Sequence, residues 1–282
     1  MDLNWFLTIL AGIQWGYILT LWSGLLLIGQ VRYGLMAGIV HYFCTVIKRE
    51  SWIRYRVQPP FIKKEQIRSE IKWSIVTGII ISTMDLFVII SNSFDLTQLY
   101  SNISDYGTSY FIFSVIIMIL FHDAYFYWTH RLLHWKPLYR RIHKIHHNSV
   151  STSAFTSFNF HPIEAFIQFA YIPIIMFTMP VHWLSLTIFL SYMTIFNILW
   201  HNSYEFWPKD HVRNKWMNIF STPTHHNIHH KKVNYNYALY LTYWDRLMGT
   251  MHPEYEKIYD SVKERASSSA VIFTDPYNDT VL

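Results

Sequence analysis

Long stretches without a charged residue divide this chain, and they predict where helices cross a membrane. Leu3–Val31 has 29 positions without a charge, and about 20 apolar residues suffice to span a hydrocarbon core. We therefore expect a first transmembrane helix there. The next charge-free stretch, Tyr33–Ile47, has 15 residues and directly follows Arg32, so it predicts either a short span or a helix in the membrane interface.

A basic segment then sets the expected orientation. Residues 48–72 carry eight Lys or Arg and three Glu, and Pro59-Pro60 would break any helix there. Cytoplasmic loops are enriched in Lys and Arg, so we expect this segment to be cytoplasmic. Trp73–Ile90 would cross outward, the Lys- and Arg-free loop Ser91–Ser109 would lie outside, and Tyr110–Tyr127 would return.

A third apolar region is too long for a single crossing. Ala165–Trp200 has 36 residues without a charge, which is about 54 Å as a straight helix, and it contains Pro173 and Pro180. We expect a bent or re-entrant hairpin that leaves the cytoplasmic side and returns to it. The whole pattern predicts an all-α integral membrane protein with four to five transmembrane or re-entrant helices and a cytoplasmic histidine-rich cap.

The expected organisation is one domain over residues 1–282. It would comprise N-terminal membrane helices with the basic loop (1–109), a histidine-rich catalytic region (110–252) and a loose polar tail (253–282). The composition, 51% hydrophobic and 15% charged, excludes disorder and a coiled coil. The net charge of +5 comes from basic blocks beside the spans, so it indicates membrane topology and we expect no nucleic-acid partner.

Histidine carries the candidate chemistry. The chain has 16 His and a single cysteine, Cys44, which excludes an intramolecular disulfide framework and a cysteine metal cluster. The pattern His-x-x-His-His occurs twice, whereas random placement would give it ~0.05 times. Residues three and four apart share a helix face, so each cluster is expected to direct its imidazoles at one point. Eight of the histidines form three such clusters: His130 and His134; His143, His146 and His147; His226, His229 and His230.

Eight or more imidazoles exceed what one tetrahedral zinc site can use. The count therefore predicts a binuclear metal centre. Imidazole binds zinc, copper, iron and nickel, so the ligand type alone identifies neither the metal nor the reaction.

Several short motifs surround these clusters in a fixed order. They are His122–His134, His143–Ser149, Phe160–Glu164, Thr222–His230, Asn236-Tyr237 and Trp244–Thr250. Together they strongly resemble the sterol desaturase and fatty acid hydroxylase superfamily over roughly residues 121–250. The resemblance implies a membrane-bound non-haem diiron enzyme that uses O2 and two electrons. It would hydroxylate or desaturate an unactivated C–H bond of a membrane lipid, such as a sterol, a fatty acyl chain or a sphingoid chain.

The resemblance also implies a set of iron ligands, with no catalytic side chain beyond them. Relatives often carry a further histidine four positions before the ninth ligand, where this chain has Asn197, so the tenth ligand stays open. His225 is a candidate to replace it. The implied ligands are His130, His134, His143, His146, His147, His201, His226, His229 and His230.

Six residues are candidates for an additional ligand or for a partner that holds the ligands. A carboxylate that accepts the outer N–H of a ligand histidine fixes its ring. Ion pairs with nearby Arg or Lys would explain Asp123, Glu205 and Asp245 equally well. His161 and Glu164 are expected to be either close to the centre or structural. The six are His225, His161, Asp123, Glu164, Glu205 and Asp245; we expect His41, His122, His182, His211 and His252 to be structural.

The expected partners follow from this chemistry. The substrate would reach the site from the bilayer, and electrons would come from cytochrome b5, a ferredoxin or a reductase, because no cytochrome b5-like segment occurs in these residues. The basic blocks at 48–72 and 140–144 either form the docking surface for this electron donor or only mark the cytoplasmic side of the membrane. We expect the endoplasmic reticulum membrane in a eukaryote or the cytoplasmic membrane in a bacterium.

One competing function is a histidine-rich membrane metal transporter or metal sensor. A transporter needs ionisable ligands near the bilayer midplane. The histidine clusters instead lie beside charged residues at the ends of the apolar stretches, which favours the enzyme.

Overall fold

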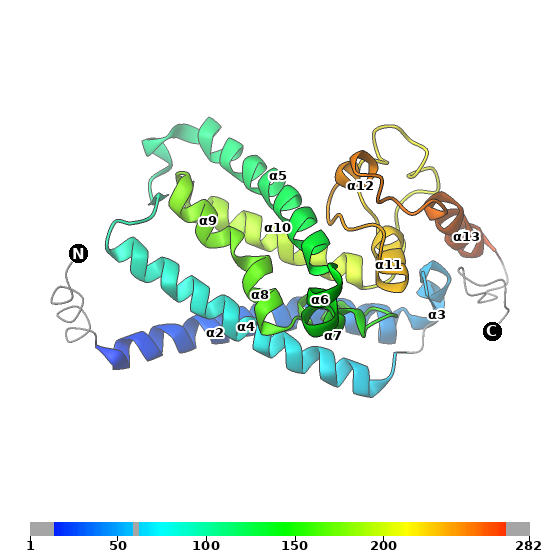
Figure 1. The fold of residues 1–282 in the computed structure, drawn as a ribbon, viewed down its shortest axis with the longest axis horizontal. Helices are drawn as coiled ribbons and strands as arrows, with labels where there is room; N and C mark the ends of the chain where they lie inside the picture. The colour runs from blue at the N-terminus through cyan, green and yellow to red at the C-terminus, as the bar shows by residue number, and fades with distance from the viewer. Residues whose placement is uncertain (1–13, 59–61, 269–282) are drawn as a thin grey trace.

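The computed structural model describes residues 14–58 and 62–268, which are mostly helical (Figure 1). Two short apolar helices, α8 (Pro162–Phe169) and α9 (Tyr171–Thr178), accompany the long ones. The predicted all-α membrane architecture is therefore confirmed. Four helical segments are long and apolar enough to cross a membrane: Trp15–Ile47, Lys64–Ser93, Gly107–Leu133 and Trp183–His201.

The long helices are α2 (Trp15–Tyr42), which continues as a π-helical turn at Phe43–Ile47, α4 (Lys64–Ser93), α5 (Gly107–Leu133) and α10 (Trp183–His201). The short helices are α3 (Arg49–Trp52), α6 (Lys136–Leu138), α7 (Lys144–His147), α11 (Pro223–Lys232), α12 (Tyr243–Leu247) and α13 (Tyr255–Ser267). Further turns are 3-10 helical at Ile53–Tyr55, Ile103–Asp105 and Ala154–Phe158 and π-helical at Tyr139–His143, and the strands are β1 (Leu99–Tyr100) and β2 (Val181–His182).

The N-terminal span is one helix rather than two. α2 continues through Arg32, and this side chain lines a small cavity that Asp85 of α4 also lines. A charge of opposite sign across the helix pair offsets the cost of placing Arg32 inside a span. The prediction of a separate element at Tyr33–Ile47 is therefore wrong. The beginning of the expected first span, before Gln14, and Pro59-Pro60 lie outside the described residues.

The long apolar region folds back on itself, as predicted. α8 and α9 lead away from the histidines, the chain turns at Pro180, and α10 returns to them (Figure 1). The turn is held by a hydrogen bond from the Tyr110 hydroxyl to the Pro180 carbonyl oxygen, 2.9 Å. The parallel pairing of β1 with β2 holds it as well.

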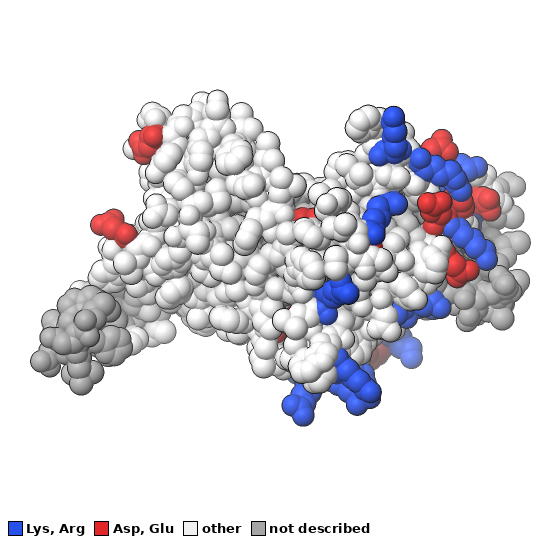
Figure 2. Space-filling view, turned by 45° about the horizontal axis from the view of Figure 1, so that its top comes forward, with Lys and Arg blue, Asp and Glu red and all other residues white. Residues whose placement is uncertain are grey.

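Charged side chains gather at one end of the molecule. Figure 2 shows Lys and Arg over the end that carries α11–α13, whereas the opposite half is white apart from two acidic patches. The gathering of basic residues towards one end of the long apolar helices is the arrangement that the sequence pattern predicts.

The C-terminal region is more ordered than its polarity suggests. The expected loose tail is wrong for α13, whose apolar side chains at helical spacing are buried against Val212 and Ile228. The spacing of three and four residues was visible in the sequence and is typical of an amphipathic helix. These side chains are Tyr255, Ile258, Tyr259 and Val262.

A buried carboxylate holds the loop that follows the second histidine cluster. Glu70 of α4 accepts hydrogen bonds from the hydroxyls of Ser149, at 2.7 Å, and Thr156, at 2.9 Å. It also accepts from the Ser153 hydroxyl and from the Gln66 amide nitrogen. The loop is thus fixed to α4 through one side chain.

We expect Glu70→Ala to lower the free energy of unfolding by about 2–4 kcal/mol, because several buried donors lose their acceptor. Denaturant unfolding of the purified protein in detergent measures this. Glu65→Ala, an exposed position on the same helix, is the matched control and should change stability little. Equal effects of the two substitutions would contradict the role given to Glu70.

Candidate metal centre

The structure brings all nine expected ligands into two adjoining groups. Within each group, one nitrogen per residue lies within 4.8 Å of every other. Two nitrogens bound to one metal at about 2.1 Å are at most about 4.2 Å apart, so small shifts would bring each group to a single ion. The first group is His130, His134, His143, His147 and His229, and the second is His146, His201, His226 and His230.

Helix geometry divides each His-x-x-His-His motif between the two groups. Residues four apart share a group, as in His143 with His147 and His226 with His230. The residue three positions on, His146 or His229, joins the other group. Successive helical residues point about 100° apart, so two neighbouring histidines cannot approach the same ion. The prediction that each cluster converges on one point is therefore wrong for these two motifs.

Four segments deliver these side chains to the same place. His130 and His134 come from the end of α5, and His201 is the last residue of α10. The second cluster spans the π-helical turn Tyr139–His143 and α7, and the third lies on α11. Thr222 caps α11 by accepting a hydrogen bond from the His225 amide. The centre thus lies where apolar helices end.

The outer nitrogens of several rings are fixed by backbone carbonyls. His130 Nδ1 donates to the Tyr237 carbonyl at 2.8 Å, His201 Nδ1 to the Asn197 carbonyl at 2.8 Å, and His229 Nδ1 to the Tyr235 carbonyl at 2.7 Å. A neutral imidazole that donates from Nδ1 keeps a lone pair on Nε2. These three rings therefore turn Nε2 lone pairs towards the two groups.

The inner nitrogens face one another at distances that suit a shared cation. His130 Nε2 lies 3.1 Å from His143 Nε2, and His201 Nε2 lies 2.8 Å from His226 Nε2. Other ring nitrogens are buried without a hydrogen-bond partner, which is costly for a polar atom. Converging lone pairs and orphaned nitrogens both fit metal ions at these positions. The unpartnered atoms include His134 Nδ1 and Nε2, His147 Nε2 and His229 Nε2.

The electrostatic environment keeps the rings neutral. Seven histidines of the two groups lie outside the spans, and the pKa of each is far below its ordinary value. Burial is the larger cause, and repulsion from neighbouring imidazoles is the second. The seven are His134, His143, His146, His147, His226, His229 and His230. Neutral imidazole is the form that binds metal. The site is therefore prepared to bind metal at neutral pH.

Glu164 is the carboxylate that contacts a ligand candidate. Its Oε1 lies 2.6 Å from His143 Nδ1, and both side chains are buried. A carboxylate at the outer nitrogen fixes ring orientation and makes the inner nitrogen a stronger donor to metal. The sequence predicts that Glu164 is either close to the metal centre or structural, and this contact supports a position close to the centre.

The other three candidate carboxylates bind backbone amides instead of ligand rings. Asp123 accepts from the amides of Tyr240 and Leu241, and Glu205 accepts from those of Trp207 and Thr224. The expectation that they hold ligand N–H groups is wrong. Buried amides need acceptors, and these carboxylates supply them to segments next to the third histidine cluster. Burial also raises the pKa of Glu205.

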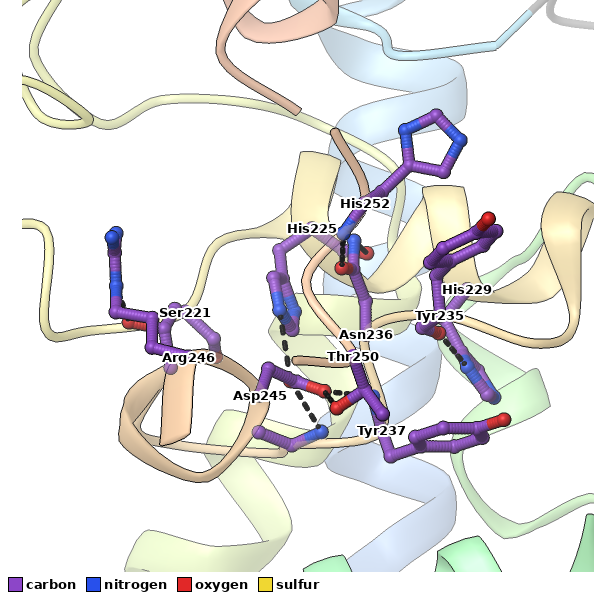
Figure 3. A network of polar contacts seen from close by, with 12 residues as sticks. Ser221, His225, His229, Tyr235, Asn236, Tyr237, Asp245, Arg246, Thr250 and His252 are labelled. Carbon is purple, nitrogen blue, oxygen red and sulfur yellow. Dashed lines mark hydrogen bonds and ion pairs between the residues drawn. The ribbon is translucent and has the colours of Figure 1, made fainter. Parts of the chain in front are cut away.

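Asp245 and His225 form a separate network behind the first group (Figure 3). Asp245 Oδ1 accepts from the Tyr237 amide at 2.9 Å, and Oδ2 accepts from the Ala238 amide. His225 Nε2 lies 3.2 Å from Asp245 Oδ2. Burial alone would raise the pKa of Asp245, but the contacts with His225 and Thr250 hold it below its usual range. Asp245 thus positions Tyr237, whose carbonyl orients His130.

The remaining polar candidates lie outside both groups. His225 belongs to neither, so the structure does not place it as a tenth ligand. His161 caps α8 by accepting from the Ile163 amide. Asn197, the position considered for a tenth ligand, donates from its side chain to the Ser157 carbonyl. His122 contacts the Tyr240 hydroxyl through Nδ1 at 2.9 Å.

The comparisons with known proteins give the family of the chain. A family model described as fatty acid hydroxylase matches residues 115–250. The chain is 31% identical to lathosterol oxidase of Rattus norvegicus over 78% of this chain and 73% of the relative. For lathosterol oxidase of Homo sapiens the identity is 31%, over 76% and 71%. For a Delta(7)-sterol 5(6)-desaturase of Gibberella zeae it is 28%, over 82% and 69%. No solved structure matches this chain significantly.

The fold and the site define an integral membrane oxidoreductase with a histidine-rich centre able to hold metal ions. The chain belongs to the sterol desaturase and fatty acid hydroxylase superfamily.

The two groups predict a selective effect of substitution on metal content. We expect His147→Ala to reduce the metal of the first group and His230→Ala that of the second, so each variant should retain roughly one of two ions. Elemental analysis of detergent-purified protein measures this. His225→Ala, on the same helix as His230 but in neither group, is the control and should retain both ions. Loss of metal from His225→Ala alone would contradict the assignment.

Proposed function

We propose that this protein is an O2-dependent diiron enzyme that desaturates or hydroxylates an unactivated C–H bond of a membrane lipid. The observation that carries the proposal is the pair of buried imidazole groups at the charged end of membrane-spanning helices. A sterol is the first candidate substrate, because the relatives that match most of the chain are named as sterol desaturases and lathosterol oxidases.

The two groups would each hold one iron ion. Five neutral imidazoles are available to one ion and four to the other. When bound, the two irons would supply the redox chemistry that reduces O2 with two external electrons and removes hydrogen from the substrate. Imidazole also suits zinc, but zinc has no redox chemistry. An oxidation of this kind therefore favours a redox-active metal over zinc, and the resemblance to the sterol desaturase and fatty acid hydroxylase superfamily implies iron.

The side chains of this protein would hold the ions and shape the space beside them. Glu164 fixes His143, and backbone carbonyls fix His130, His201 and His229. Because these contacts are buried, the rings are preorganised and water is excluded from their outer sides.

A small internal cavity marks where the substrate would meet the centre. It holds about 10 Å³ and is lined mainly by apolar residues of α5, α8, α9 and α10, with Phe160 and Asn197. The ring of Phe160 lies 5.0 Å from that of His146, and the Asn197 carbonyl binds His201. Since a cavity of about 10 Å³ has room for about one water molecule and none for a lipid, we propose that these helices separate to admit the lipid.

We further propose that the metal end faces the cytoplasm and takes electrons from a separate donor, such as cytochrome b5, a ferredoxin or a reductase. The gathering of Lys and Arg at that end supports this orientation. His134 is the one member of the two groups that is not fully buried, so the first group is the one closer to the surface for an incoming electron.

Lipid analysis with metal analysis tests the proposal. We expect cells that express the protein to accumulate a lipid that has lost two hydrogens or gained one oxygen. The purified protein should hold two iron ions per chain. His147→Ala and His230→Ala should abolish the product while still inserting into the membrane. Unchanged lipids in cells with a competent donor, or zinc alone in protein from iron-replete cells, would refute the proposal.

The cavity yields a separate prediction. Met193→Trp would place a much larger side chain where the helices are proposed to separate, and should lower turnover by roughly tenfold or more, because a misplaced substrate reacts much more slowly. Leu190→Trp, a half-buried position on the same helix that does not line the cavity, is the control. Both variants must keep the metal content of the unsubstituted protein, and equal turnover in the two would argue against this substrate position.

A further inference from the structure

A second cavity, distinct from the metal centre, lies where the first two spans meet the basic segment. It holds about 430 Å³ and lies between the end of α2, the short helices after it and the start of α4. Four cations line it, Arg49, Arg56, Lys64 and Arg68, and none of the described residues around it is acidic. Such a concentration of charge around a hollow attracts an anion.

Arg56 is the cation that the fold encloses most completely. Its exposed fraction is 3%, and its guanidinium lies over the ring of Tyr204, 5.6 Å from the centroid. Two of its nitrogens, Nε and Nη2, are buried without a hydrogen-bond partner, and within residues 14–58 and 62–268 it forms no ion pair. Tyr204 is thus its aromatic partner, but a buried cation that keeps two nitrogens without an acceptor is unfavourable.

His41 contributes a further buried nitrogen without a hydrogen-bond partner. Its ring lines the same cavity from α2, and Nδ1 is also buried without a partner. Burial lowers the pKa of Arg56 from its ordinary value, and the contact with Tyr204 opposes that shift only in part. Polar groups of this kind are rare in native structures unless something binds them.

The size and the place of the cavity select the kind of anion. A volume of about 430 Å³ is in the range of small-molecule sites and far exceeds that of a chloride ion. The apolar side chains beside it, Tyr42, Val46, Ile71 and Ile75, are exposed on the helices that bound it. Hydrocarbon-facing surface next to a cationic hollow is the arrangement that holds the headgroup of an anionic lipid.

We propose that this cavity binds the phosphate group of an anionic phospholipid, with the acyl chains lying against α2 and α4. Arg49 and Arg68 receive the phosphate at the opening, and Arg56 supplies the deepest positive charge. The site is separate from the ligands of the metal centre. Gln58, two residues after Arg56, donates to Asn227 of α11 at 2.9 Å, so the bound lipid also braces the segment that contacts the third histidine cluster.

The experiment measures binding of dioctanoyl phosphatidic acid to the full chain in detergent micelles by isothermal titration calorimetry. Dioctanoyl phosphatidylcholine and inorganic phosphate are the comparison probes. We expect saturable binding of phosphatidic acid and roughly tenfold weaker binding of either comparison probe. The double variant Arg49→Gln/Arg68→Gln should weaken phosphatidic acid binding by roughly tenfold or more.

The matched control removes two cations from the same basic segment outside the cavity. Lys63→Gln/Lys72→Gln changes two exposed side chains and should change affinity less than about twofold. All variants must keep the melting temperature and metal content of the unsubstituted protein, and Arg56→Gln supplies a second test at the deep position. Equal weakening in both double variants would show attraction to general surface charge and overturn the proposal. Phosphate binding as tight as phosphatidic acid binding would overturn the assignment to a lipid.

Discussion

The structure depends on placing nine neutral imidazoles in a buried space with their lone pairs turned inward. An α-helix turns about 100° per residue, so neighbouring histidines point at different places. Each His-x-x-His-His motif therefore contributes to both groups, and each group draws on three or four segments of the chain. The first group can form only when the end of α5, the Tyr139–His147 segment and α11 have come together, and the second only when α7, α10 and α11 have. The metal centre can therefore reach its geometry only when the helices that carry its ligands have packed together.

Hydrogen bonds at the outer nitrogens fix the orientation of several of these rings. Four of them donate to carbonyl oxygens, and two of these carbonyls belong to the segment after α11, at Tyr235 and Tyr237. That segment has a left-handed residue, Asn236, and its amides bind Asp123 and Asp245. These aspartates act on the centre through the backbone. This explains how residues that do not touch a ligand ring still determine its orientation.

Much of this was predictable from the sequence and the rest was not, for physical reasons. Charge-free length predicts the long helices because hydrocarbon excludes charge, and histidine spacing predicts the set of residues that the structure brings together. The continuity of α2 past Arg32 could not be predicted from local sequence, because Asp85, which lines the same small cavity, is distant along the chain. The carbonyl partners have no sequence signal because every residue has a carbonyl. His225 has the same local spacing as a ligand, but Asp245 takes its ring.

The apolar hairpin connects the metal groups to the space beside them. Near its start, Glu164 contacts His143 of the first group, and at its end His201 belongs to the second group. Between these points α8, α9 and α10 line the small internal cavity. Any separation of the helices that enlarges the cavity therefore acts on both groups at once. The turn at Pro180, held by Tyr110 and by the pairing of β1 with β2, lies at the opposite end from the histidines. Phe169 and Tyr171 flank the break between α8 and α9 and both line the cavity, so the proposed separation of helices would involve the hairpin at this break.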